Sequence, residues 1–191
     1  MLRILIIDES RARAAELCGG LATAGHQVAA VLPSALDLTA RIEDIKPDVI
    51  LIETDSPSRD TLENLAVMDR EMPRPVIILT QEDDAAVMRE AFRAGVSAYV
   101  VDNLDMARLK PIVDVAIARF ESHQAVKREL ADATRKLSER KLVDKAKGIL
   151  MKTRGLDEDA AYSALRKLAM ERSQPIGKVA GDLIEMARLL L

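Results

Sequence analysis

The sequence contains very few aromatic residues. Its 191 residues include two Tyr, two Phe and no Trp. Proteins that bind single-stranded nucleic acid without sequence preference stack successive bases on several aromatic rings. This chain cannot offer such a platform.

Cysteine and long apolar runs are also scarce. The single Cys18 excludes an internal disulfide and any zinc site built from several cysteines. No apolar run approaches the roughly 18 residues of a membrane-spanning helix. The short apolar run at residues 2–7 ends at Asp8 and is too short for a secretory signal. We therefore expect a cytoplasmic protein.

Charge is divided unevenly along the chain. Residues 1–126 carry 13 Lys and Arg against 21 Asp and Glu, whereas residues 127–191 carry 15 against 10. The overall charge of −3 thus hides an acidic first part and a basic second part. This asymmetry predicts that the second part meets a polyanion. A solvated charged surface would have the same composition.

Five short apolar segments alternate with segments of helical spacing in the first part of the chain. The apolar segments are residues 2–7, 28–32, 49–52, 76–79 and 98–101, and the helical ones are residues 11–24, 35–45, 60–70 and 84–94. Strands that are apolar throughout are typical of a sheet covered on both faces. The pattern therefore predicts an α/β domain at residues 1–120, with a doubly wound, flavodoxin-like, parallel five-stranded sheet.

A long helical stretch follows, without a convincing turn between residues 106 and 153. It is either one helix or two nearly continuous ones. We interpret residues 121–134 as a linker that either forms a short dimeric coiled coil or packs only on its own chain. The candidate seam positions are Val113, Ala116, Phe120, His123, Lys127, Leu130, Thr134 and Leu137. Gly155 and Pro175 then divide residues 135–191 into an all-α unit of three helices.

Polar residues follow four of the predicted strands. They are Asp8 with Glu9, Glu53, Thr80 and Asp102. The carboxyl ends of parallel strands gather functional groups at one edge of a sheet. Asp8, Glu9 and Glu53 are oxygen donors that could hold a weakly bound Mg²⁺. Simple solvation of these side chains at strand ends is the alternative.

Over about residues 1–120 this pattern resembles the receiver domain of two-component systems. The resemblance rests on the acidic pair Asp8-Glu9, the loop at residues 53–57, Thr80 as the switch hydroxyl and Tyr99 as the switch aromatic. It implies a phosphoacceptor pocket at the sheet edge.

Two positions depart from the receiver pattern. Glu53 stands where receivers have the phosphoacceptor Asp, and Asp102 stands where they have a Lys that pairs with the acyl phosphate. The extra methylene of Glu53 moves its carboxylate by more than the roughly 0.5 Å that a preorganised site tolerates. Asp102 would repel a phosphoryl group. We predict a receiver-like domain that is not switched by phosphotransfer. The alternative is that Asp55, two residues past the expected site, substitutes as the phosphoacceptor.

Basic residues are concentrated at the start of the second part. Residues 135–154 carry eight Lys and Arg against two acidic residues. Helical spacing predicts one apolar face and, nearly opposite, a face with Lys141, Lys145, Gly148 and Lys152. A glycine inside an exposed helix costs about 1 kcal/mol relative to alanine. Gly148 therefore predicts the close approach of a bulky partner such as a nucleic-acid backbone, with contact to the first domain as the alternative.

The second part resembles the ANTAR domain of the AmiR/NasR family of transcription antiterminators, over about residues 130–190. The matching blocks are residues 146–151 (Ala-Lys-Gly-Ile-Leu-Met), 160–162, 165–170 and 179–180. Residues 55–60 and 95–102 of the first part look like the NasT-type antiterminators of nitrate assimilation.

The resemblance implies binding to paired stem-loops in nascent leader RNA and control by a nitrate- or nitrite-sensing NasS-like protein. RNA loops are recognised through splayed bases and backbone contacts. The candidate RNA contacts are Arg140, Lys141, Lys145, Lys147, Gly148, Lys152, Arg166 and Lys167. We expect Met151 and Met170 to lie in the core.

Two other functions compete with this one. A DNA-binding response regulator is the main alternative, because three short helices can form a helix-turn-helix. An interaction module without nucleic acid is the other. The basic residues lie on the first helix rather than on a later recognition helix, which favours RNA. We expect no enzyme and no required cofactor, because the acidic pocket lacks a nucleophile–base pair and no phosphate-binding glycine loop follows a strand.

Overall fold

The protein consists of two compact units, Met1–Gln124 and Ala125–Leu191. The computed structural model describes residues 1–101 and 105–190. No helix within those residues is long and apolar enough to cross a membrane.

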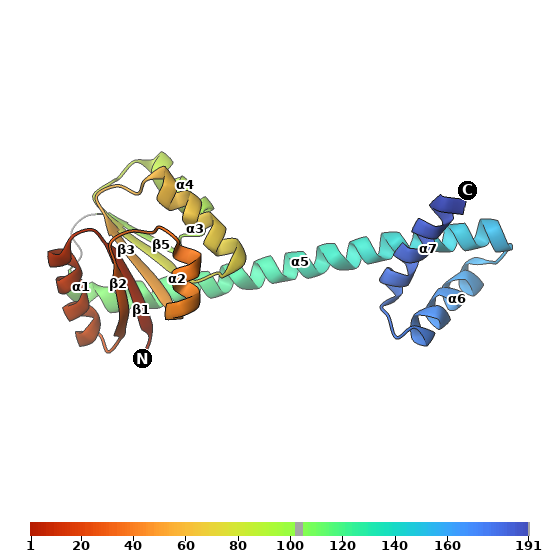
Figure 1. Cartoon of the computed structure of the whole chain (residues 1–191), viewed down its shortest axis with the longest axis horizontal. Coiled ribbons are helices and arrows are strands. Elements are labelled where there is room, and N and C mark those ends of the chain that lie inside the picture. The colour runs from red at the N-terminus through yellow and green to blue at the C-terminus, as the bar shows by residue number, and fades with distance from the viewer. Residues whose placement is uncertain (102–104, 191) are drawn as a thin grey trace. The chain divides into compact units, whose positions relative to one another are not determined.

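The first unit is built around a parallel five-stranded sheet (Figure 1). Its strands lie in the order β2-β1-β3-β4-β5. They are β1 (Arg3–Asp8), β2 (Gln27–Leu32), β3 (Val49–Thr54), β4 (Val76–Thr80) and β5 (Ala98–Val101). The predicted doubly wound, flavodoxin-like sheet is confirmed.

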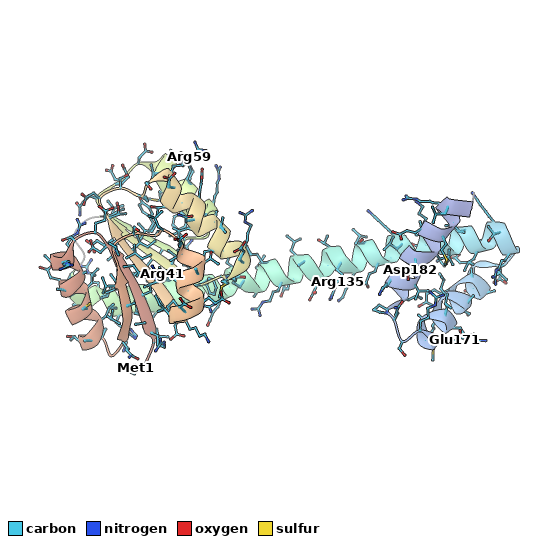
Figure 2. The ribbon with its side chains drawn as sticks, viewed as in Figure 1. Met1, Arg41, Arg59, Arg135, Glu171 and Asp182 are labelled. Atoms are coloured by element: carbon cyan, nitrogen blue, oxygen red, sulfur yellow. The ribbon has the colours of Figure 1, made fainter. Side chains whose placement is uncertain are left out.

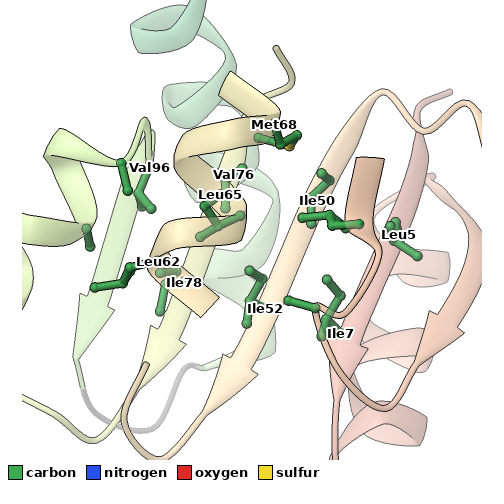
Figure 3. Close-up of a cluster of buried hydrophobic side chains, with 14 of the residues drawn as sticks. Leu5, Ile7, Ile50, Ile52, Leu62, Leu65, Met68, Val76, Ile78 and Val96 are labelled. Carbon is green, nitrogen blue, oxygen red and sulfur yellow. The ribbon is translucent and has the colours of Figure 1, made fainter. Parts of the chain in front are cut away.

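Helices cover both faces of this sheet because successive strand residues point to opposite sides. Leu5 and Ile7 pack with α2 (Leu38–Ile45), α3 (Arg59–Glu71) and α4 (Ala85–Arg93) in one cluster, part of which is shown in Figure 3. Ile4 and Ile6 pack on the other face with α1 (Arg11–Thr23) and with the beginning of α5 (Leu109–Arg154). The strands are therefore apolar throughout.

Helix α5 is a single helix of 46 residues, which settles the choice between one helix and two. A 3₁₀ turn at Met106–Arg108, capped by Asp105, leads into it. Its side chains between residues 126 and 140 are exposed, including that of Arg135, labelled in Figure 2. Two predicted seam residues, Val113 and Ala116, are instead fully buried in the core of the first unit. The prediction that these two residues belong to a coiled-coil seam is therefore wrong, because the sheet already covers that part of the helix.

The second unit contains the end of α5, α6 (Glu158–Glu171) and α7 (Ile176–Leu190). Gly155 adopts a positive φ of 64° where α5 ends, and the side chain of Asp157 caps α6. The core is formed by Val143, Ala146, Leu150, Ala161, Leu165, Ala180 and Ile184. Thr153 is exposed, because the buried face of α5 ends one turn earlier at Leu150.

Candidate nucleic-acid interface and receiver pocket

The carboxyl ends of β1 and β3 border a cavity of about 390 Å³. Asp8 lies opposite Glu53 in the parallel register of these strands. Glu9 and Asp55 line the same cavity. The structure therefore brings together the acidic residues that the sequence predicted here, Asp102 excepted, which lies outside the described residues.

Arg13 spans this cavity with its guanidinium group. Its Nη2 lies 3.3 Å from Oδ1 of Asp8, and its Nη1 lies 2.8 Å from Oδ1 of Asp55. The side chain of Asp8 is fully buried, so its charge needs a partner, and Arg13 supplies one. The backbone N–H of Ser10 also donates to Asp8, at 2.7 Å. Sequence reasoning missed Arg13, although its place in the first turn of the helix after Asp8 was a usable signal.

The sequence also predicts weak Mg²⁺ binding at the carboxylates of this cavity. Within residues 1–101 and 105–190, no group of three or more His, Cys, Asp or Glu side chains is arranged to hold a metal ion. Mg²⁺ requires nearly octahedral oxygen ligands. The positive guanidinium of Arg13 lies against Asp8 and would repel such a cation. Weak Mg²⁺ binding at Asp8, Glu9 and Glu53 therefore stays a prediction, and Arg13 disfavours it.

Glu53 is electrostatically disfavoured in its charged form. Burial raises the pKa of Glu53, and the neighbouring carboxylate of Asp8 raises this pKa further. The positive charge of Arg13 opposes both effects without cancelling them. A carboxyl group in this setting gains a proton more readily than an ordinary glutamate.

Hydrogen bonds connect the residues predicted as the switch pair. Thr80 is buried, and its hydroxyl donates to the carbonyl of Asp55 at 2.9 Å. The same hydroxyl accepts the backbone N–H of Glu82 at 3.2 Å. The hydroxyl of Tyr99 donates to the carbonyl of Glu82 at 3.1 Å. A continuous chain of hydrogen bonds thus runs from the loop after β3 to β5.

Most of the predicted RNA contacts lie on the surface of the second unit. The exposed ones are Arg140, Lys141, Lys145, Lys152, Arg166 and Lys167. Arg140 and Lys167 each lie 4.0 Å from a carboxylate one turn away on the same helix. Exposed pairs at such a distance contribute little free energy. These side chains therefore remain available to a polyanion.

Lys147 is the exception among the predicted contacts. Only 15% of its side chain is exposed, and its Nζ lies 2.8 Å from Asp144 and 2.7 Å from Glu158. These carboxylates raise the pKa of Lys147, and Lys147 lowers the pKa of Asp144. Lys147 therefore connects α5 to the start of α6, and its charge is already balanced. Sequence reasoning had not paired it, because Glu158 lies beyond the turn at Gly155.

Gly148 lies beside this ion pair on α5 and is half-buried. Apart from its chain neighbours and the adjacent backbone of its own helix, a Cβ atom added there would meet no atom of the described residues within 4 Å. Packing inside the described chain therefore does not require a glycine at this position. The close approach of a partner remains the physical reason that we propose for it.

The exposed apolar residues of the second unit include three that belong to the blocks matching the ANTAR domain. Tyr162 is 45% exposed, Met170 is 72% exposed and Met151 is 40% exposed. The prediction that the two methionines lie in the core is wrong. On α6 the buried positions are Ala161, Leu165 and Ala169, so Met170 falls one helical step beyond them. Tyr162 was part of a matching block, but its exposure could not be read from that match.

Both parts of the chain match known families. Residues 4–114 match the response regulator receiver domain, and residues 131–184 match the ANTAR domain. The chain therefore belongs to the response regulators and combines a receiver domain with an ANTAR domain.

Individual relatives agree with this assignment. The chain is 26% identical over 183 residues to the transcriptional regulatory protein PdtaR of Mycobacterium tuberculosis. That match covers 96% of this chain and 89% of PdtaR. It is 37% identical over 75 residues to the nitrate regulatory protein of Klebsiella oxytoca. That match covers 38% of this chain and 19% of the other protein. A receiver domain of a modulated diguanylate cyclase from Desulfovibrio desulfuricans G20 superposes with a TM-score of 0.56 at 22% identity, covering 64% of this chain and 98% of that domain. This last likeness concerns the fold alone.

Proposed function

We propose that this response regulator is a transcription antiterminator that binds paired stem-loops in nascent leader RNA. The observation that carries the proposal is the open helical position at Gly148, flanked by the exposed Lys145 and Lys152 within the ANTAR match. RNA loops are bound through backbone contacts and unstacked bases, which such a surface can approach closely. Exposed cations supply the salt-dependent part of the affinity.

The proposal extends to the biological setting. Similarity to a protein named nitrate regulatory protein supports nitrate or nitrite assimilation genes as targets. We propose a NasS-like sensor protein as the partner, as the resemblance of residues 55–60 and 95–102 to NasT-type antiterminators implies. Arg13 and Glu53 support control by a protein rather than by phosphotransfer, because Arg13 already pairs with Asp8 and Asp55. We assign residues 1–120 to the receiver, residues 121–134 to a linker and residues 135–191 to RNA binding.

Filter binding tests the RNA proposal directly. The probe is a pool of RNA hairpins with one fixed stem and randomised loops, compared with duplex DNA of the stem sequence. We expect the full chain to select a subset of hairpins and to bind them more tightly than the DNA. Equal or tighter binding to the DNA would favour the DNA-binding response regulator instead.

Charge reversal locates the surface. The double variant Lys145→Glu with Lys152→Glu should weaken hairpin binding and flatten its salt dependence, because phosphate contacts are lost. Lys178→Glu, an exposed residue of α7, is the matched control and should have little effect. Unchanged binding by the double variant would favour an interaction module without nucleic acid.

Intact mass measurement tests the receiver. After incubation with a small-molecule phosphodonor and Mg²⁺, we expect no covalent phosphoryl adduct. A stoichiometric adduct would overturn control by a protein partner alone.

A further inference from the structure

Tyr162 is unusual among the aromatic residues of this chain. All four aromatic residues lie within the described residues, and Tyr162 alone is exposed. Tyr99 is hydrogen-bonded in the first unit, and Phe92 lies 5.1 Å from the guanidinium carbon of Arg119. The hydrophobic effect favours burial of such a ring. An exposed aromatic in a chain with so few of them is therefore a feature to explain.

Tyr162 belongs to a stripe on α6. Residues four apart lie above one another on a helix, so Tyr162, Arg166 and Met170 follow one side of α6. All three side chains are exposed. The stripe thus places a ring, a planar guanidinium and a polarisable thioether next to one another, beside the buried face of α6 that carries Leu165 and Ala169.

The ion pair of Lys147 connects α5 to the start of α6, close to this stripe. Glu158, which contacts Lys147 at 2.7 Å, lies one turn before Tyr162 on α6. Lys147 directly precedes Gly148 on α5. The contact therefore joins the start of α6, one turn before Tyr162, to α5 next to Gly148, and the exposed side chains of both helices around this contact form one surface.

The charges along this surface indicate which partner fits. The carboxylates at its centre, Asp144 and Glu158, are both engaged by Lys147. The exposed charges around them include the positive Lys145, Lys152 and Arg166 and, at the start of α6, the negative Asp157 and Asp159. A polyanion that also has flat, unpaired rings satisfies both the cations and the exposed aromatic. An RNA loop has both properties, whereas an apolar peptide satisfies only the aromatic part.

We propose that the ring of Tyr162 stacks on one splayed base of the bound RNA loop, with Arg166 beside it and Met170 extending the apolar platform. The inference rests on the proposed function and names a base-binding position within it. Loop bases that leave the helical stack are bound on aromatic rings and on arginine planes. The single ring predicts one stacked base, not a track of them.

The experiment compares Tyr162→Phe and Tyr162→Leu with the wild type in the full chain. The probe is the tightest hairpin from the randomised-loop pool, with 2-aminopurine placed at each loop position in turn. Phe keeps the ring and should keep the affinity. Tyr162→Leu keeps a residue that favours helix but removes the ring. This variant should bind the hairpin about 5- to 150-fold more weakly than the wild type, which corresponds to the loss of one stacked base. One 2-aminopurine position should be quenched by the wild type and by Phe, but not by Leu.

Salt dependence separates stacking from charge. Tyr162→Leu should lower the affinity without changing the slope of binding against salt, because no phosphate contact is lost. Thermal unfolding of both variants checks that the second unit remains folded. Wild-type affinity and quenching in the folded Leu variant would overturn the stacking role while leaving RNA binding intact. Failure of the wild type to bind any hairpin would instead refute the proposed function, and the stacking role with it.

Discussion

Arg13 is the single residue that most changes the interpretation of the receiver pocket. It supplies the positive charge that buried Asp8 requires, and it reaches Asp55 as well. The sequence predicted the acidic residues around this pocket but not the arginine among them. Strand ends can be located from apolar segments, whereas the approach of a helical side chain depends on how α1 packs against β1.

Replacing Arg13 should convert the pocket into a cation site. Arg13→Ala leaves the buried carboxylate of Asp8 without its charged partner and should lower the free energy of unfolding by about 1–2 kcal/mol, a modest loss because Arg13 is partly exposed. Mg²⁺ should then raise the Tm of the variant more than that of the wild type. Arg11→Ala, an exposed change in the same helix, is the control. Equal stabilisation of the wild type by Mg²⁺ would contradict this interpretation of Arg13.

Glu53 should make the stability of the first unit depend on pH. Its pKa is raised above the ordinary 4.5, so the folded state holds its proton to higher pH than the unfolded state. Stability then falls as pH rises from 4.5 through the raised pKa. Glu53→Gln should therefore raise the Tm at pH 7, and the gain should disappear below pH 4.5.

Thermal unfolding at a series of pH values measures this effect. Glu9→Gln, an exposed carboxylate at the same cavity, should show no comparable gain. If the gain in Tm from Glu53→Gln instead grew as the pH fell, the predicted direction of the pH dependence would be wrong.

Helix α5 shows at the scale of elements what sequence patterns predict well. The absence of a turn between residues 106 and 153 predicted helical structure there, although the structure was needed to choose between one helix and two. The strands were predicted from apolar segments that are buried on both faces. The side chains exposed on these elements are harder to predict. Met170 is apolar and yet exposed, and Lys147 is charged and yet mostly covered. The exposure of such a side chain depends on how the neighbouring helix packs, and the periodicity of a single helix does not predict that packing.

Gly148→Ala should change stability and RNA binding in opposite directions. Alanine is the better residue inside a helix by about 1 kcal/mol, and its Cβ would meet no described atom within 4 Å. The Tm of the second unit should therefore rise. Affinity for the selected hairpin should fall, because the added methyl group lies where we propose the RNA to approach. Gly19→Ala, which is equally open on α1, is the control that should leave RNA binding unchanged. Undiminished hairpin binding by Gly148→Ala would remove Gly148 from the interface.

Lys147 should affect RNA binding only through the carboxylates that it neutralises. Lys147→Met releases Asp144 and Glu158, whose charges would then repel RNA phosphates, and it should also lower the Tm of the second unit. Adding Asp144→Asn and Glu158→Gln to this variant should restore most of the hairpin affinity measured by filter binding. If affinity stays low in the triple variant, Lys147 contacts RNA directly, as the sequence had first indicated.

The whole molecule presents an exposed apolar stripe on α5 within its second unit. Val126, Leu130 and Leu137 are all exposed and share one side of the helix. We propose that a second copy of the chain covers this stripe, so that the protein forms a homodimer through its linker region.

Sedimentation equilibrium tests the dimer. Leu130→Glu with Leu137→Glu should shift the wild-type dimer to monomer, because the stripe would bury two charges per chain. Ala131→Glu, which lies on another side of the same exposed segment, should remain dimeric. A monomeric wild type at all concentrations measured would refute the dimer and leave the remaining assignments unchanged.

The scarcity of aromatic residues has a spectroscopic consequence at this scale. With no Trp, the intrinsic fluorescence of the chain comes from two tyrosines, one in each unit. Tyr99 reports on the hydrogen-bonded loop of the receiver, and Tyr162 reports on the surface proposed to meet RNA. Changing either one to Phe leaves a single native fluorophore in the other unit. Occupation of each unit by its own partner can therefore be followed separately, without an added dye.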